Sequence, residues 1–187
     1  MKLGLTSTSI KIYDYTQKWK KEYLKQEKKL KKLLKNFNIQ IEHIGSTSII
    51  GCSAKPIIDI AIGVQSLEYG KQLIPILEKN GWNHSGTADY GVRWFLKKDK
   101  GNLSTHFIHI EDINSRIWQN HIIFRDYLNT HPEKVAEYSR IKKDCEIKFK
   151  ENRKGYAQTK NPFIEETIKT ALKEWNIEQV GENYTIK

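Results

Sequence analysis

The sequence has few cysteines and no long apolar run. Its 187 residues include only Cys52 and Cys145, with no CxxC pair and no metal-ligand spacing. This pattern indicates a reducing environment and two unpaired thiols. No stretch approaches the ~18 consecutive apolar residues that a membrane-spanning helix needs. The first residues also lack the apolar core and cleavage site of a secretory signal. We therefore expect a cytoplasmic protein without membrane segments, forming a single domain over residues 1–187.

The positive charge is concentrated near the start of the chain. Residues 1–37 hold eleven lysines and three acids, a net charge of +8 out of +10 for the whole sequence. Within residues 16–37, Trp19, Tyr23, Leu30 and Leu34 recur at helical spacing, which predicts an amphipathic helix with a lysine-rich outer face. That face is either simply solvated or attracts phosphate groups. Any nucleic-acid binding through it would be weak and salt-sensitive, because no recognition motif accompanies it.

The remaining sequence alternates strand and helix patterns. We predict strands over residues 39–45, 56–64, 90–98 and 103–111, the last two joined as a hairpin. We predict helices over residues 66–81, 115–131, 132–149 and 161–175, with Ser66 as an N-cap. Pro132 and Pro162 each stand where a helix would begin. The expected fold class is α+β, a small mixed β-sheet flanked by helices, with a helical C-terminal half over residues 114–177.

A turn follows the first strand, at Gly45, Ser46 and Thr47. Glycine permits a backbone conformation that a side chain would obstruct, and the two hydroxyls can complete an anion site formed by free backbone N–H groups. The same triplet also suits an ordinary turn or helix cap. Lys55 adds a cation further along the loop, where it either binds phosphate or is merely exposed.

The next strand carries one carboxylate, Asp59, in an otherwise apolar run. Side chains alternate along a strand, so one face of it is wholly apolar and forms core: Ile58, Ile60, Ile62 and Val64. The other face holds Asp59 with Ala61 and Gly63, which predicts a small, open surface. A carboxylate beside an anion-binding turn can hold Mg²⁺ against phosphate oxygens. Alternatively, Asp59 accepts hydrogen bonds from the preceding loop and has a structural role.

Two residues of the fourth strand share the face predicted to meet Asp59. His109 and Glu111 lie two apart on that strand, together with Thr105 and Phe107. His109 would act there as a general base near neutral pH, or as a hydrogen-bonded structural histidine.

Three further residues are candidate phosphate or nucleotide contacts. Arg93, in the third predicted strand, suits a bidentate phosphate clamp or an exposed hairpin position. Tyr156 and Lys160 stand in a polar connector before the last predicted helix. They would contact a base and phosphates, or belong to a solvated loop.

Five motifs in one order carry a resemblance to a known family: "IEHIGSTS", "AKPIIDI", "THFIHI", "HIIFRDYLNTHPEKVAEYSRIKK" and "GYAQTKNPFIEE". From about residue 13 to residue 175, the chain resembles the GrpB family, small bacterial proteins named glutamate-rich protein B. That family falls, by resemblance, in the DNA polymerase beta-like nucleotidyltransferase superfamily. The superfamily has a Gly-Ser turn and then a strand with an acid-apolar-acid pattern.

The resemblance implies roles for matched positions. Gly45 and Ser46 match the triphosphate-binding turn, Asp59 matches the first metal-binding acid, and His109 stands nearest to the third acid. The second acid is replaced by Ala61, which leaves one carboxylate where two-metal phosphoryl transfer uses several. The sequence thus supports two readings: a Mg²⁺-dependent nucleotidyltransferase acting on a nucleoside triphosphate, or a nucleotide- or phosphate-binding domain without turnover. An accessory interaction domain is a third, since some relatives are joined to a kinase of coenzyme A biosynthesis.

Overall fold

A mixed five-stranded sheet lies at the centre of the molecule. The computed structural model describes residues 3–88, 91–149, 153–180 and 183–186. The sheet consists of β1 (Gln40–Ile44), β2 (Ile58–Val64), β3 (Asn83–Ala88), β4 (Arg93–Lys100) and β5 (Leu103–Asp112). Its strand order is β1-β2-β5-β4-β3. β2 and β5 run parallel, whereas the other neighbours are antiparallel. The predicted α+β fold with a mixed sheet is confirmed.

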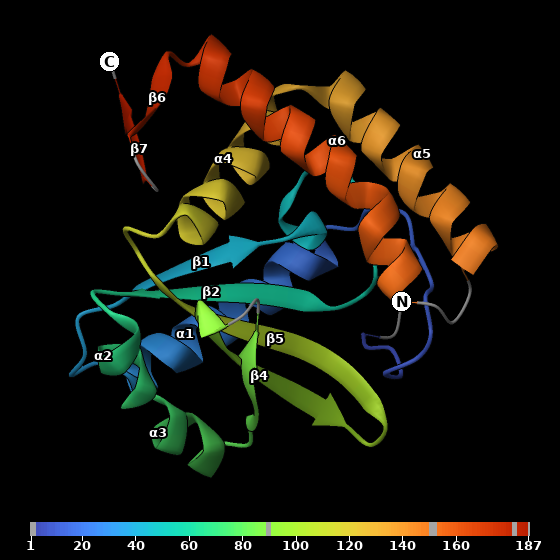
Figure 1. The fold of residues 1–187 in the computed structure, drawn as a ribbon. Coiled ribbons are helices and arrows are strands. Elements are labelled where there is room, and N and C mark those ends of the chain that lie inside the picture. The colour runs from blue at the N-terminus through green and yellow to red at the C-terminus, as the bar shows by residue number, and fades with distance from the viewer. Residues whose placement is uncertain (1–2, 89–90, 150–152, 181–182, 187) are drawn as a thin grey trace.

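Helices cover both faces of this sheet (Figure 1). One face carries α1 (Lys18–Leu33), α2 (Leu67–Lys71) and α3 (Ile74–Lys79). The other face carries α4 (Arg116–Thr130), α5 (Pro132–Phe149) and α6 (Arg153–Glu174), which form most of the C-terminal half. A short hairpin of β6 (Ile177–Val180) and β7 (Asn183–Ile186) follows α6. That all 187 residues form one domain stays a prediction.

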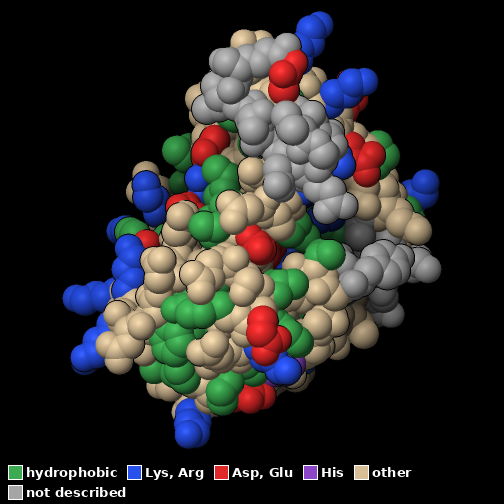
Figure 2. Space-filling model, turned by 60° about the vertical axis from the view of Figure 1, so that its left-hand side comes forward, with side chains coloured by type: hydrophobic (Ala, Val, Ile, Leu, Met, Phe, Trp, Pro, Cys, Tyr) green, Lys and Arg blue, Asp and Glu red, His purple; other side chains and the backbone are tan. Residues whose placement is uncertain are grey.

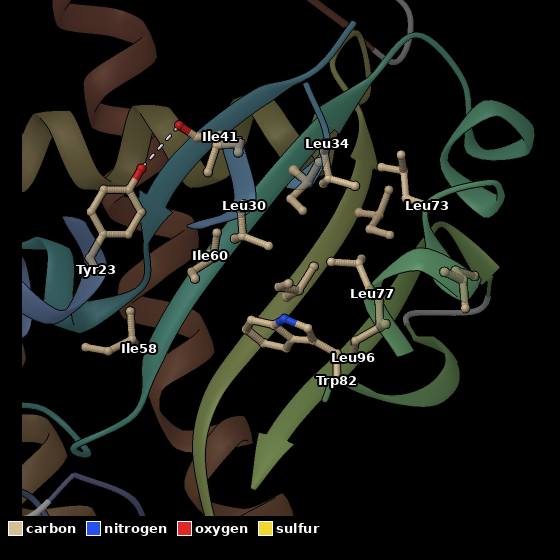
Figure 3. Packing of buried hydrophobic residues seen from close by; sticks show 14 of the residues in the cluster. Tyr23, Leu30, Leu34, Ile41, Ile58, Ile60, Leu73, Leu77, Trp82 and Leu96 are labelled. Atoms are coloured by element: carbon tan, nitrogen blue, oxygen red, sulfur yellow. Dashed lines mark hydrogen bonds between the residues drawn. The ribbon is translucent and has the colours of Figure 1, made fainter. Parts of the chain in front are cut away.

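The main core lies between the sheet and α1, α2 and α3. The face of β2 predicted to be apolar is buried there, with Ile58, Ile60 and Ile62 at 0% exposure. Figure 3 shows Ile60 beside Leu30 of α1, and Leu34, which follows that helix, and Leu77 of α3 belong to the same cluster. Burying each such side chain stabilises the fold by about 1.5–3 kcal/mol. The predicted amphipathic helix is therefore confirmed, and its apolar residues are buried in the main core.

The second face of β2 is less open than predicted. Ala61 is fully buried in a small apolar cluster with Ile44 and Trp118. A Cβ atom added to Gly63 would lie 2.5 Å from Ile113 Cγ2 and 2.8 Å from the Trp118 ring. The α4 indole thus fills the space above these two small residues, so this face is open only near Asp59.

One predicted helix is divided in two. The structure has α2 and α3 where residues 66–81 suggested one continuous helix. The N-cap is right, because Ser66 Oγ accepts a hydrogen bond from the Tyr69 N–H at 3.2 Å. Pro75 explains the division, since it stands in the first turn of α3 and a proline is tolerated there but not in a helix interior.

The predicted start of the last helix is also wrong. α6 begins at Arg153, so Tyr156 and Lys160 lie on a helix rather than in a connector, and Pro162 is inside that helix. Tyr156 and Phe163 are buried on either side of the proline, and this packing outweighs the lost backbone hydrogen bond. Strand β3 was not predicted because it is an edge strand of mostly small or polar residues (Asn83, His84, Ser85, Gly86, Thr87 and Ala88). β6 and β7 were not predicted either.

Candidate functional site

The turn after β1 is pressed against the carboxylate of β2. Gly45 has φ +67°, and a Cβ atom there would lie 2.7 Å from Asp59 Oδ2. Only glycine satisfies both the conformation and the close approach. The Ser48 N–H and hydroxyl both donate to the Gly45 carbonyl, at 3.1 and 2.6 Å, closing the turn over Ser46 and Thr47. The sequence prediction that this turn and Asp59 lie together is therefore met by direct contact.

Asp59 is held from the neighbouring strand. Asp59 Oδ1 lies 3.3 Å from His109 Nε2. Burial lowers the pKa of His109, although the hydrogen bond and charge of Asp59 oppose this. The histidine is therefore neutral near pH 7, and the tautomer with the proton on Nε2 donates to the carboxylate. His109 Nδ1 is buried and has no hydrogen-bond partner among the described residues. This arrangement makes His109 a group that orients Asp59 from behind.

A second acid, Glu111, is already occupied by protein partners. It is fully buried and accepts hydrogen bonds from Arg93 Nη1 at 3.3 Å and from His121 Nδ1 at 3.2 Å. Burial opposes ionisation of Glu111, but the His121 hydrogen bond and the nearby basic groups outweigh it and lower its pKa. Glu111 is thus an ionised internal anchor. Arg93, predicted as a phosphate clamp, directs one nitrogen to it.

Two lysines converge on one aromatic ring. Lys55 Nζ lies 4.0 Å from the Tyr156 ring centroid, and Lys160 Nζ lies 5.3 Å from it. Lys55 belongs to the loop before β2, whereas the other two stand one turn apart on α6. Burial lowers the pKa of Lys160, and the charge of Asp59 partly opposes that shift. These contacts place two cations on the side of the site facing Asp59.

These groups line a pocket of about 590 Å³ between the sheet and α4, α5 and α6. It brings together eight of the nine predicted site residues: Gly45, Ser46, Thr47, Lys55, Asp59, Arg93, Tyr156 and Lys160. His109 is the remaining one, and it reaches the site through Asp59. The pocket also has polar lining residues that we did not predict: Asn120, His121, Tyr138, Asn161 and Glu165.

A helical pattern in the sequence could have predicted some of the lining residues that we missed. Tyr156, Lys160, Ile164 and Ile168 all line the pocket and recur every four residues. That spacing marks one helix face once the helix is taken to begin before Pro162. Asn161 and Glu165 lie beside the same stripe.

The donor groups suit at most one metal ion that arrives with its ligand. Among the residues that the structure describes, no three His, Cys, Asp or Glu side chains are arranged to hold a metal. Mg²⁺ favours several oxygen ligands, and of the residues that the structure describes only Asp59 offers a pocket-lining carboxylate next to the turn. A preformed two-metal centre does not fit, whereas a single Mg²⁺ shared between Asp59 and phosphate oxygens does.

Residues 9–170 match the family model described as GrpB protein. The chain belongs to the GrpB family. It is 32% identical over 170 residues to glutamate-rich protein GrpB of Alkalihalophilus pseudofirmus, covering 89% of this chain and 98% of that protein. It is 33% identical over 166 residues to UPF0157 protein YqkA of Bacillus subtilis. That match covers 89% of this chain but only 48% of YqkA, so the chain spans about half of the length of that relative.

Solved structures show the same family and a wider fold class. The crystal structure of conserved protein GrpB from Enterococcus faecalis superposes with a TM-score of 0.79 at 30% identity, covering 88% of this chain and 99% of that one. The Cid1 poly(U) polymerase with Mg 3'-dATP bound matches with a TM-score of 0.51 at 17% identity, over 70% of this chain and 41% of that one. The fold of this GrpB-family chain is therefore nucleotidyltransferase-like. Within the described residues, no helix is both long and apolar enough to cross a membrane.

Proposed function

We propose that this GrpB-family chain binds a nucleoside triphosphate in the pocket and transfers its nucleotidyl group in a Mg²⁺-dependent reaction. The observation that carries the proposal is the contact between the Gly45 turn and Asp59 inside a pocket that also holds Lys55 and Lys160. A backbone turn, a carboxylate and two cations are the groups that nucleotide phosphates require. The likeness in fold to a polymerase with Mg 3'-dATP bound supports the same assignment.

The phosphates would lie at the turn. Backbone N–H groups and the hydroxyls of Ser46 and Thr47 supply hydrogen-bond donors, and the lysines neutralise charge. Tyr138 lines the same pocket as Ser46 and Thr47 of the turn. This chain's own residues thereby bind and orient the reacting phosphate. One bound Mg²⁺, shared by Asp59 and the phosphates, would supply further charge neutralisation, and His109 positions that carboxylate.

The base would lie among the aromatic and amide side chains of the same pocket. Phe107, Phe124 and Tyr156 offer apolar surface for a planar ring, and Asn120 and Asn161 offer polar contacts. The pocket volume of about 590 Å³ is within the range for small-ligand sites, about 300–1,000 Å³. We therefore expect the nucleotide to extend from the turn towards α4 and α6. The acceptor is not defined by these contacts.

A second candidate is nucleotide binding without turnover. Two observations favour it: Ala61 is packed under Trp118, and Glu111 is held by Arg93 and His121. Neither position leaves a free carboxylate for a second metal ion. The two candidates share the bound ligand and differ only in whether the α–β phosphate bond is broken.

Calorimetric titration with ATP, GTP, CTP and UTP in Mg²⁺ buffer tests both candidates. We expect saturable binding of at least one nucleotide, and Lys160→Met should weaken it about tenfold, or about 1.4 kcal/mol. Lys25→Met is the matched control, because Lys25 is exposed on α1, on the other face of the sheet. Pyrophosphate release in the presence of RNA or small hydroxyl acceptors would establish transfer. Binding without release supports the second candidate, and the absence of any binding contradicts both.

A further inference from the structure

A lysine and a cysteine lie in contact behind the pocket, and both are buried. Lys142 of α5 is 1% exposed and Cys52 is 0% exposed. Lys142 Nζ donates to Cys52 Sγ at 2.8 Å. This separation is no longer than an ordinary N–H···O bond of about 2.9–3.0 Å, although sulfur is the larger acceptor. The two reactive atoms are close enough for one oxygen atom to bond to both.

Besides each other, the two side chains contact an aromatic ring, a hydroxyl group and a backbone carbonyl, to which Cys52 Sγ donates at 3.7 Å (Ser53). Lys142 Nζ lies 4.0 Å from the Tyr138 ring centroid, and the Ser139 hydroxyl donates to Cys52 Sγ at 3.9 Å. Among the ion pairs of the described residues, none joins Lys142 to a carboxylate. Burial lowers the pKa of Lys142 to about 8, so a fraction of it is the nucleophilic neutral amine near neutral pH. Tyr138 also lines the 590 Å³ pocket, so the pair lies behind one wall of it.

We propose that Lys142 and Cys52 are a modification site, at which hydrogen peroxide joins them through an N–O–S bridge. The first peroxide molecule oxidises the thiol to a sulfenic acid and leaves as one water. The second accepts two electrons as the Lys142 nitrogen bonds to the sulfenic oxygen. The N–H and O–H bonds that break provide its protons, and it leaves as two waters. Sulfur and nitrogen each lose two electrons, and the two peroxides accept the four.

The N–O–S bridge would join two elements that border the pocket. Cys52 lies in the loop between the Gly45 turn and β2, and Lys142 lies one turn beyond Tyr138 on α5. Tyr138 lines the pocket together with Ser46 of the turn. A covalent link would fix this wall of the pocket to the helix layer. The bridge itself does not depend on the proposed nucleotide function.

Mass spectrometry of the full-length protein tests this proposal directly. After peroxide treatment near pH 8, and before any alkylation, we expect a species about 14 Da heavier than the untreated chain, one oxygen gained and two hydrogens lost. Trypsin should no longer cleave after Lys142, and the peptides containing Lys142 and Cys52 should be joined. A thiol reductant should separate them. Cys145→Ser should retain the bridge, because Lys142 donates to Cys52 and Cys145 is the other buried thiol.

Three results would overturn the proposal. Cys52 could take up one, two or three oxygens, about 16 Da each, while trypsin still cleaves after Lys142. The protein could keep its original mass under peroxide. A Cys52→Ser or Lys142→Arg variant could form the same 14 Da product, which would place the modification elsewhere.

Discussion

Gly45 is required for two reasons, its positive φ angle and its close approach to Asp59, and experiment can separate them. Gly45→Ala places a side chain at φ +67° and 2.7 Å from Asp59 Oδ2, so we expect lower stability and displacement of the carboxylate. Gly81 has φ +82° with no atom within 4 Å of an added Cβ, so Gly81→Ala carries the backbone strain alone. Gly81→Ala should lose about 1–2 kcal/mol of unfolding free energy, and Gly45→Ala should lose more because of the added contact with Asp59. Only Gly45→Ala should also weaken nucleotide binding, by tenfold or more in calorimetry.

Equal loss of nucleotide affinity in the two glycine variants would contradict a role for the turn in binding. It would instead indicate a general effect of lower stability.

Ala61 stands where the resemblance implies a second acid, and its apolar surroundings do not suit a carboxylate. Its methyl group is fully buried against Ile44 and Trp118. Ala61→Asp should therefore bury an unpaired carboxylate and lower the unfolding free energy by about 3–5 kcal/mol, measured by denaturant titration. Ala61→Ser, a smaller change, should cost less. A stable Ala61→Asp protein with tighter Mg²⁺ binding would show that the carboxylate reaches the pocket after all.

His43 makes stability depend on pH. Burial lowers its pKa to about 4, from 6.5 in the unfolded chain, while its ring stacks on Tyr23 at 4.4 Å. Between these two pKa values the unfolded state binds a proton at His43 and the folded state does not. The free energy of unfolding that His43 contributes is therefore complete above about pH 6.5 and falls as the pH decreases towards 4. From pH 7 to pH 5 this one group should remove about 2 kcal/mol.

His43→Gln should be less stable at pH 7 but should lose about 2 kcal/mol less over that interval, measured by urea unfolding at each pH. His106 has a lowered pKa of about 4 for the same reason, so some acid sensitivity should remain. A pH dependence identical to that of the unmodified chain would show that His43 is not the titrating group.

At the scale of elements, the sequence predicted best where alternation was strict. β2 shows this: its apolar face is core as expected, and Asp59 stands where the turn meets the sheet. β5 alternates in the same way, with Ile108 in the main core and His109 at Asp59 on the other face.

Elements defined by packing rather than by local pattern were not predictable. The proline at position 162 suggested a helix start, but the buried Tyr156 extends α6 back to Arg153. The Trp118 ring covers the small residues of β2, although it is 55 residues after Gly63 in the chain. Long-range contacts of this kind decide which lining residues enter the pocket. That is why Asn120, His121 and Glu165 were missed.

At the scale of the whole molecule, Figure 1 shows the lysine-rich α1 on one face of the sheet and α4, α5 and α6 on the other. Residues of these last three helices line the pocket. On the face drawn in Figure 2, basic side chains lie mainly along the outline, with acidic ones between them. The protein has a net charge of +10, of which residues 1–37 supply +8. We infer that the lysines of α1 attract polyanions without delivering them to Asp59.

Binding of single-stranded RNA should therefore be weak and should fall at least tenfold between about 50 and 200 mM salt, measured by fluorescence anisotropy. Replacing Lys28, Lys29 and Lys32 by glutamine should reduce that salt dependence. Tight binding that survives high salt and discriminates between sequences would contradict this account of the charge.

The most direct test of the central claim is nucleotide titration of Asp59→Asn with Mg²⁺ and with a chelator. If Asp59 meets a cation carried by the nucleotide phosphates, the unmodified chain should bind more tightly with Mg²⁺ than with the chelator. Asp59→Asn should abolish that gain and leave the affinity in chelator unchanged, because the turn and the lysines remain. The contrary result is an Asp59→Asn protein with a lower melting temperature whose affinity is unchanged, or falls equally, in both buffers. That outcome would make Asp59 a structural residue and remove the metal from the proposed function.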